Sequence, residues 1–197
     1  MNAASVSAID LFCGAGGLSL GLSQAEISVE AGIDIDGDCE YPFSFNLDAR
    51  FIHESVRDVT GTQLEELWDP NANFRLLAGC APCQPFSSQR RGTDTSREEE
   101  WDLLREFLRL VKVSMPEYVT MENVAPLRTK QIFREFVGSL AEIGYHVRFD
   151  VLSGEKYGLP QVRKRLVLLA ALHQPVNIPK PTVQTGSERT VRDALGY

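Results

Sequence analysis

The sequence contains no apolar run near the roughly 20 residues that a membrane-spanning helix needs, so a membrane protein is disfavoured. The N-terminus has no basic stretch followed by an apolar core, so we expect no secretory signal and a cytoplasmic protein. There are 4 cysteines, and they form no disulfide framework. We therefore expect reduced thiols at Cys13, Cys39, Cys80 and Cys83.

Positive charge is also scarce, because 20 Lys and Arg stand against 27 Asp and Glu, for a net charge of -7. Firm binding to a nucleic-acid backbone needs clustered Lys and Arg, so this chain alone is not expected to hold DNA or RNA tightly. The basic residues do gather locally, and the charge is therefore polarised, which leaves room for a positive site. These local groups are Arg90, Arg91 and Arg97, and Lys156, Arg163, Lys164 and Arg165.

The order of apolar patterns predicts an α/β fold. A chain of 197 residues suffices for one domain with a sizeable core. Apolar runs bounded by turn residues predict strands at 6–12, 29–35, 74–78, 118–121, 147–152 and 165–171. Helical spacing lies between most of them, at 18–25, 39–47, 62–67, 99–113 and 131–143. This alternation predicts a doubly wound, mostly parallel sheet of the Rossmann-like kind.

The end of the chain is expected to differ from the rest. The last two predicted strands are joined by a loop containing Gly and Pro with no room for a helix, so the last strand should pair antiparallel. Beyond it the sequence is rich in Pro, Thr and Gly. We expect a catalytic domain over residues 1–172, followed by a linker or extended tail over 173–197.

A glycine-rich turn joins the first predicted strand to the first predicted helix. Gly14, Gly16 and Gly17 let the backbone approach a ligand closely, and Asp34 at the tip of the next strand is placed to bind two ribose hydroxyls. Nucleotide-binding sheets share these features. Ser19 stands where a Gly-x-Gly-x-x-Gly pattern would put its third glycine. The turn alone leaves a dinucleotide, another nucleotide-like cofactor and a plain structural turn open.

The segment Pro82-Cys-Gln-Pro-Phe-Ser87 places a cysteine after a predicted strand, at the carboxyl end of the sheet. A thiolate is a strong nucleophile, and prolines stiffen the turn around Cys83. The alternatives are a redox pair with Cys80, a zinc site and a packing cysteine. A redox motif normally leads straight into a helix, and the 3 histidines are scattered, so we favour Cys83 as a nucleophile and expect no metal site.

Two further segments carry a carboxyl group and guanidinium groups. Glu122 in Met121-Glu-Asn-Val124 ends a strand, where a carboxyl group in a partly dry pocket can hold a proton against a ring nitrogen. In Gln161-Val-Arg-Lys-Arg165 the alternation puts Arg163 and Arg165 on one side, and their planar forks suit a carbonyl oxygen or a carboxylate. A helix-capping Glu and a solvated charge run are the alternatives.

Together, these segments resemble the DNA (cytosine-5) methyltransferase family from about residue 8 to residue 192. The resemblance implies S-adenosylmethionine as cofactor and methylation of cytosine C5 in DNA. It further implies that Cys83 adds to C6 of a flipped base, that Glu122 bonds N3 and the exocyclic amine, that Arg165 holds O2, and that Arg163 supports Cys83 and Glu122. The cofactor residues that it implies are Phe12, Gly14, Gly16, Gly17, Leu18, Asp34, Ile35, Asp58, Val59 and Pro82.

Family members normally continue, after a segment like Thr190-Val-Arg-Asp-Ala-Leu195, into a DNA-reading domain and a final helix that completes the cofactor pocket. We therefore expect a catalytic half, whether a fragment, a truncated product or one subunit of a split restriction-modification type enzyme. DNA and a second subunit are the expected partners, and no membrane is. The alternatives are a transfer-RNA cytosine-5 methyltransferase, a non-catalytic regulatory partner of a methyltransferase, and a nicotinamide oxidoreductase.

Overall fold

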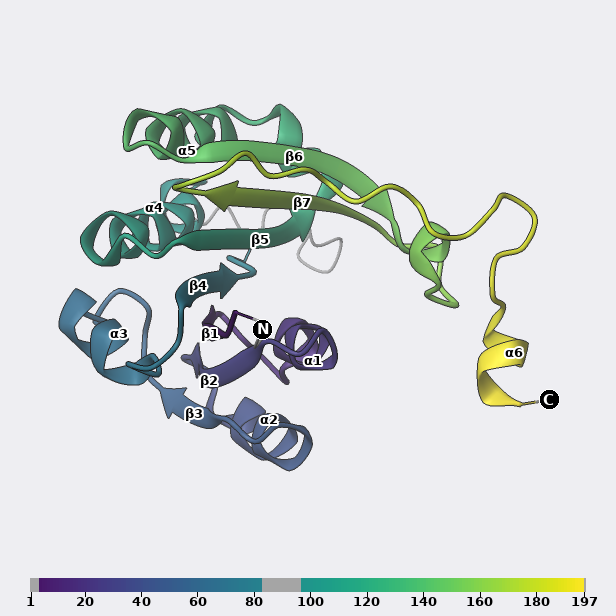
Figure 1. Cartoon of the computed structure of the whole chain (residues 1–197), viewed down its shortest axis with the longest axis horizontal. Coiled ribbons are helices and arrows are strands. Elements are labelled where there is room, and N and C mark those ends of the chain that lie inside the picture. Colours follow the sequence, from purple (N-terminus) through teal and green to yellow (C-terminus); the bar gives the residue numbers. More distant parts are fainter. Residues whose placement is uncertain (1–3, 83–96, 197) are drawn as a thin grey trace.

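The structure is a computed structural model that describes residues 4–82 and 97–196, and its centre is one mixed β-sheet (Figure 1). The sheet order is β3-β2-β1-β4-β5-β7-β6. Neighbouring strands from β3 to β5 pair parallel, and β7 runs antiparallel between β5 and β6. This confirms the predicted doubly wound, mostly parallel sheet with an antiparallel last strand. The strands are β1 (Val6–Leu11), β2 (Ser28–Asp34), β3 (Arg50–His53), β4 (Phe74–Gly79), β5 (Tyr118–Val124), β6 (His146–Ser153) and β7 (Lys164–Ala171).

The strand predictions differ from the structure by one missed strand and by the ends of predicted strands. The sequence analysis missed β3, which is short, half-exposed and paired only with β2 at the edge of the sheet. The strand predicted over 118–121 continues to Val124, so Glu122 lies within β5 and its side chain alternates with those of buried Met121 and Asn123. The strand predicted over 6–12 ends one residue earlier than expected, at Leu11. Phe12 has a φ of 58°, and a left-handed residue does not continue a strand.

Helices cover both faces of the sheet. In Figure 1, α1 and α2 lie on one face, and α3, α4 and α5 lie on the other. Short 3₁₀ turns, η1 (Gly37–Cys39), η3 (Ala125–Thr129) and η4 (Gly154–Tyr157), complete the connections. The helices are α1 (Gly17–Gln24), α2 (Glu40–Asn46), α3 (Gly61–Leu67), α4 (Arg97–Ser114), α5 (Gln131–Glu142) and α6 (Val191–Leu195).

The largest apolar cluster lies between the sheet and the layer of α3, α4 and α5. Phe107 of α4 and Phe136 of α5 are buried with ring centroids 5.7 Å apart, and Met121 of β5 belongs to the same cluster. Each fully buried side chain of this size contributes about 1.5–3 kcal/mol. The cluster fixes the position of β5 and thereby the side chains at its carboxyl end.

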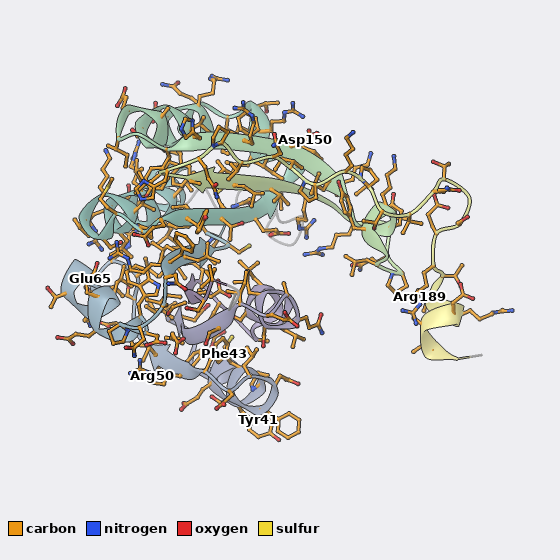
Figure 2. All side chains as sticks on the ribbon, viewed as in Figure 1. Tyr41, Phe43, Arg50, Glu65, Asp150 and Arg189 are labelled. Carbon is orange, nitrogen blue, oxygen red and sulfur yellow. The ribbon has the colours of Figure 1, made fainter. Side chains whose placement is uncertain are left out.

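A smaller cluster fixes α2 against the first two strands. Phe43 is fully buried there with Cys13 and Leu47, while Tyr41, two residues earlier, is 75% exposed. Figure 2 shows these two aromatic side chains on opposite sides of the helix. Within the described residues, no helix combines the length and the apolar character needed to cross a membrane.

The chain beyond β7 is extended until α6. The backbone N–H groups of Thr182 and Val183 donate to the carbonyl oxygen of Lys156 at 3.1 and 3.0 Å, and the Tyr157 hydroxyl donates to that of Pro179 at 3.0 Å. The η4 turn therefore holds the middle of the tail. Helix α6 begins with a capping box formed by Thr190 and Asp193.

Candidate active site

The glycine-rich turn forms where β1 ends. Phe12, Gly14 and Gly16 adopt left-handed φ values of 58°, 51° and 89°. A Cβ atom on Gly16 would lie 2.7 Å from Leu47 Cδ1, so glycine is needed there for packing against α2. No described atom would come within 4 Å of a Cβ on Gly14 or Gly17, so the turn is open on that side. An open, backbone-lined concavity at the start of α1 can receive a ligand.

Asp34 joins this turn to the end of β2. Its Oδ2 accepts a hydrogen bond from the Gly14 N–H at 2.8 Å, and its Oδ1 accepts one from the Asp36 N–H at 2.9 Å. A carboxylate oxygen has two lone pairs, so each oxygen keeps acceptor capacity for a hydroxyl group. Ile35 follows with 71% of its surface exposed, and it offers apolar area beside that carboxylate.

The other predicted cofactor residues lie around the same edge of the sheet. Phe12 and Leu18 are half-buried on either side of the turn. After β3, Asp58 is exposed, whereas the side chain of Val59 is buried and its carbonyl oxygen accepts a hydrogen bond from Arg109. Pro82 is exposed at the carboxyl side of β4. The ends of β1 and β2 therefore bring most of the predicted set together.

Glu122 and Arg165 meet at the carboxyl end of β5. Arg165 Nε lies 2.7 Å from Glu122 Oε1, with 24% and 28% of the two side chains exposed. The antiparallel register, which pairs Val124 with Arg165, brings these two side chains to one end of the sheet. A carboxylate and a planar guanidinium group, partly exposed side by side, are suited to the hydrogen-bonding edge of a flat polar ring.

Cys80 supplies a contact that the sequence analysis did not anticipate. Its Sγ donates to Glu122 Oε2 at 3.0 Å. The register of β4 with β5 pairs Gly79 with Met121, so the residues that follow lie side by side. The contact follows from this register, which the spacing of residues along the chain does not reveal. Next to it, Asn123 Nδ2 donates to the Ala81 carbonyl oxygen at 2.8 Å, and Asn123 therefore braces the loop, as its sequence context indicated.

Two predicted catalytic residues are not part of this contact. Arg163 lies just before β7 with an exposed side chain, and among the described residues it makes no ion pair with Glu122; Arg165 occupies that place. Cys83 lies outside the described residues, as do Arg90 and Arg91, so its role as nucleophile stays a prediction.

Asp10, which the sequence analysis did not single out, is a fully buried carboxyl group beneath the turn. Its Oδ2 accepts a hydrogen bond from the Ser19 hydroxyl at 2.6 Å, and its Oδ1 has no hydrogen-bond partner among the residues that the structure describes. Burial raises the pKa of Asp10 to about 7, against the lowering effect of Ser19, and the charge of Asp34 adds to the rise. An acidic residue inside an apolar strand was the available signal.

The described residues contain no cluster that could bind a metal ion, and their apolar groove is not lined by the predicted site residues. The described residues contain no group of three or more His, Cys, Asp or Glu side chains that could hold a metal ion. Burial raises the pKa of the Cys13 thiol, so that cysteine stays protonated. An apolar groove of about 470 Å³ lies on the α1 side of the sheet, among Leu22, Leu76 and Tyr118, but no predicted site residue lines it.

Comparison with known proteins gives consistent matches. The profile of the family described as C-5 cytosine-specific DNA methylase matches residues 6–197. Over 191 residues the chain is 44% identical to the Type II methylase M.HgiDII of Herpetosiphon aurantiacus, covering 95% of this chain and 53% of that relative. Over 199 residues it is 38% identical to the Type II methyltransferase M.XorII of Xanthomonas oryzae pv. oryzae, covering 95% and 45%.

A solved structure, that of a putative DNA modification methyltransferase encoded within an E. coli prophage, matches with a TM-score of 0.79 at 24% identity, over 97% of this chain and 54% of that one. This likeness confirms the fold. The chain spans about half the length of the relatives that it matches.

Proposed function

The chain belongs to the C-5 cytosine-specific DNA methylase family, and we propose that it is the catalytic half of a DNA (cytosine-5-)-methyltransferase that uses S-adenosylmethionine. The observation that carries this proposal is the Glu122–Arg165 pair, held partly exposed at the same end of the sheet as the open glycine turn. In this proposal the Glu122–Arg165 pair receives the cytosine ring, and the glycine turn receives the cofactor.

The residues of the turn fit S-adenosylmethionine. The open side at Gly14 and Gly17 leaves room for the methionine end, Asp34 has acceptors for the ribose hydroxyls, and exposed Ile35 offers an apolar surface for the adenine. Two carboxyl groups, Asp34 and buried Asp10, suit the positive charges that this cofactor carries. When bound, the cofactor supplies an activated methyl group.

The substrate step that we propose uses Cys83, Glu122 and Arg165. As the family resemblance implies, Glu122 hydrogen-bonds N3 and the exocyclic amine of cytosine, and Arg165 holds O2. The resemblance gives the support of Glu122 to Arg163, but Arg165 makes the ion pair with Glu122, so in this proposal Arg165 also orients Glu122 and Arg163 supports Cys83. The Cys83 thiolate would form a bond to C6, and C5 would take the methyl group while the cofactor's sulfonium leaves as a neutral thioether. Loss of the C5 proton to water would then break the bond to Cys83. The cytosine is flipped out, because C6 is unreachable inside the stacked duplex.

Glu122 must exchange one partner when the base arrives. Its Oε1 is bound by Arg165 and its Oε2 by the Cys80 thiol. A thiol is a weak hydrogen-bond donor, so the cytosine amine displaces it at little cost, while Arg165 keeps the carboxylate oriented.

We further propose that residues 1–172 form the catalytic domain and that 173–197 lead toward a DNA-reading region carried by a further segment or a second subunit. The net charge of -7 supports this division, because phosphate contacts have to come mainly from elsewhere. The relatives named as Type II enzymes favour a restriction-modification type enzyme. A nucleophilic thiol requires a reducing compartment, which favours the cytoplasm.

A chimera tests the function. The 197 residues are fused to the part of M.HgiDII that they do not match, and tritiated methyl incorporation into mixed-sequence DNA and into transfer RNA is measured. We expect incorporation into DNA and a covalent complex with DNA that contains 5-fluorocytosine, both lost in Cys83→Ala. Incorporation into transfer RNA alone would favour a transfer-RNA cytosine-5 methyltransferase. Activity retained in Cys83→Ala would remove the thiol mechanism.

The alternatives from other classes have their own readouts. A non-catalytic partner would form no covalent complex in this assay. A nicotinamide oxidoreductase would prefer NAD to S-adenosylmethionine in a binding titration, and the strand order already departs from the 3-2-1-4-5-6 order of dinucleotide-binding sheets.

A further inference from the structure

Asp10 is a carboxyl group in a place that normally excludes one. It lies between buried Ile9 and Leu11 in β1, in the middle of the sheet, where it is paired in register with Gly32 of β2 and Ala78 of β4. Burying a charged carboxylate without a cation is costly, and a native structure keeps such a group only where something compensates or uses it.

The contacts of Asp10 link it to the glycine turn. Ser19, itself fully buried in the first turns of α1, donates its hydroxyl to Asp10 Oδ2 at 2.6 Å. This bond ties the carboxyl end of β1 to α1 directly across the turn that contains Gly14 and Gly16. Asp10 Oδ1 keeps an unused acceptor, because no described residue donates to it.

The charged and titratable groups that act on Asp10 do not neutralise it. Asp34 at the end of β2 repels its negative charge, α1 contributes only neutral Ser19, and Cys13 in the turn stays protonated because burial raises its thiol pKa. Among the described residues, no Lys, Arg or His is among the groups that act on it. Two carboxyl groups thus lie at one open turn, and no described side chain brings a positive charge to them.

We infer that Asp10 is the proton-linked acid of the cofactor site: it is partly protonated in the free protein, and the positive charge of bound S-adenosylmethionine drives it into the ionised form, so binding releases a proton. Asp10 acts through charge and through Ser19, and is a positioning residue. This inference rests on the proposed function.

The sign of the pH dependence follows from linkage. Burial, together with Asp34, places the pKa of free Asp10 at about 7, and a bound cation lowers it. Cofactor affinity is therefore full above about pH 8 and falls as the pH drops through the pKa of the free protein. If binding lowers the pKa by about one unit, the affinity at pH 5 is about tenfold weaker than at pH 8.

The test is isothermal titration of the purified chain with S-adenosylmethionine, in two buffers that differ in ionisation enthalpy. Near neutral pH we expect release of a fraction of a proton, since a free pKa of about 7 leaves Asp10 partly protonated there. Asp10→Asn should abolish this release and flatten the affinity against pH. Subtracting the Asp10→Asn profile removes the titration of the cofactor's own amino group.

Two variants separate this role from a structural one. Ser19→Ala removes the hydroxyl hydrogen bond, the larger of the two Ser19 contacts that favour the ionised carboxylate, so the release should move to higher pH. Asp36→Asn removes an exposed carboxylate near the same turn and should leave the release unchanged. If Asp10→Asn does not fold, the Ser19→Ala shift still tests the inference.

Wild-type binding without proton release, or an equal release in Asp10→Asn, would overturn the inference and leave the proposed function standing. The same titration is made with the chimera that carries the rest of M.HgiDII. If neither the chain nor the chimera binds S-adenosylmethionine, the proposed function fails and the inference fails with it.

Discussion

Two Glu–Arg pairs sit at opposite ends of the same region of the sheet, and their surroundings differ. At the amino end of β4, Arg75 binds Glu117 through Nε and Nη2, both at 3.2 Å, and Glu65 through Nη1 at 2.7 Å. It also donates to the Met115 carbonyl oxygen and lies over the Trp68 ring, 5.4 Å from its centroid. Figure 2 labels Glu65 on α3, far from the open end of the sheet.

At the carboxyl end, Glu122 has two side-chain partners within residues 4–82 and 97–196: Arg165, which is strong, and the Cys80 thiol, which is weak. The Arg75 side chain has its donors committed within the protein, whereas Glu122 keeps one oxygen whose partner is easily exchanged. The comparison indicates that a Glu–Arg pair with several strong partners is structural. The pair with a weak partner is the one that, in the function we propose, receives the substrate.

The largest expected effect is on catalysis by Glu122→Gln. Without the carboxylate, methyl transfer by the chimera with M.HgiDII should fall about 10²–10⁴-fold, the usual contribution of a positioned acid or base. Cofactor affinity measured by titration should stay within about twofold, since Glu122 is not in the glycine turn. The matched control is Glu117→Gln, and an equal loss of activity there would break the distinction between the two ends.

The next effect is on stability. Arg75→Met removes a guanidinium group that three carboxylate contacts and a carbonyl contact hold. It leaves Glu117 without its cationic partner, although the backbone N–H of residue 75 still donates to Glu117 Oε2. Because these side chains are 28% and 21% exposed, we expect a loss of about 1–3 kcal/mol in the free energy of unfolding by urea. Arg165→Met, at the less saturated pair, should cost less, and a larger cost there would reverse the comparison.

The pH dependence of stability sharpens the same contrast. Burial acts to raise the pKa of Glu117, but the hydrogen bonds and charge of Arg75 outweigh it, so the net pKa is lowered below 4.5. A lowered pKa contributes stability that is present above pH 4.5 and is lost as the pH falls through the folded value. In urea titrations, the free energy of unfolding should fall less between pH 7 and pH 3 in Glu117→Gln than in the wild type. An identical fall would show that the Arg75–Glu117 pair is not the source of this pH dependence.

The smallest effect concerns Cys80. Cys80→Ala removes the weak donor that cytosine must displace, and Cys80→Ser replaces it with a stronger one. We expect kcat/KM for DNA to change on the order of threefold or less, upward in the alanine variant and downward in the serine variant. Changes in the same direction for both would indicate that Cys80 only packs.

How far the sequence predicts this molecule depends on where each signal lies. The sheet and the position of Glu122 at its carboxyl end follow from apolar runs and helical spacing that are local. Strand β3 was missed because an edge strand of four half-exposed residues carries no run of buried positions. The Cys80–Glu122 contact depends on the register of β4 with β5, which spacing along the chain does not determine.

Asp10 was missed for a related reason. A single acid in the apolar stretch Ala8-Ile-Asp-Leu11 signals something unusual, but only the tertiary structure shows that Ser19 reaches it and that no described cation does.

The position of β7 also bears on the order of assembly. In the described sheet, β6 has no strand neighbour except β7, although β6 is synthesised first. Both therefore join the sheet only when the chain doubles back and inserts β7 beside β5, a pairing of distant segments that forms slowly. Because Arg165 lies on β7, which is synthesised after every other strand of the described sheet, a nascent chain cannot form the Glu122–Arg165 contact before β7 has been made.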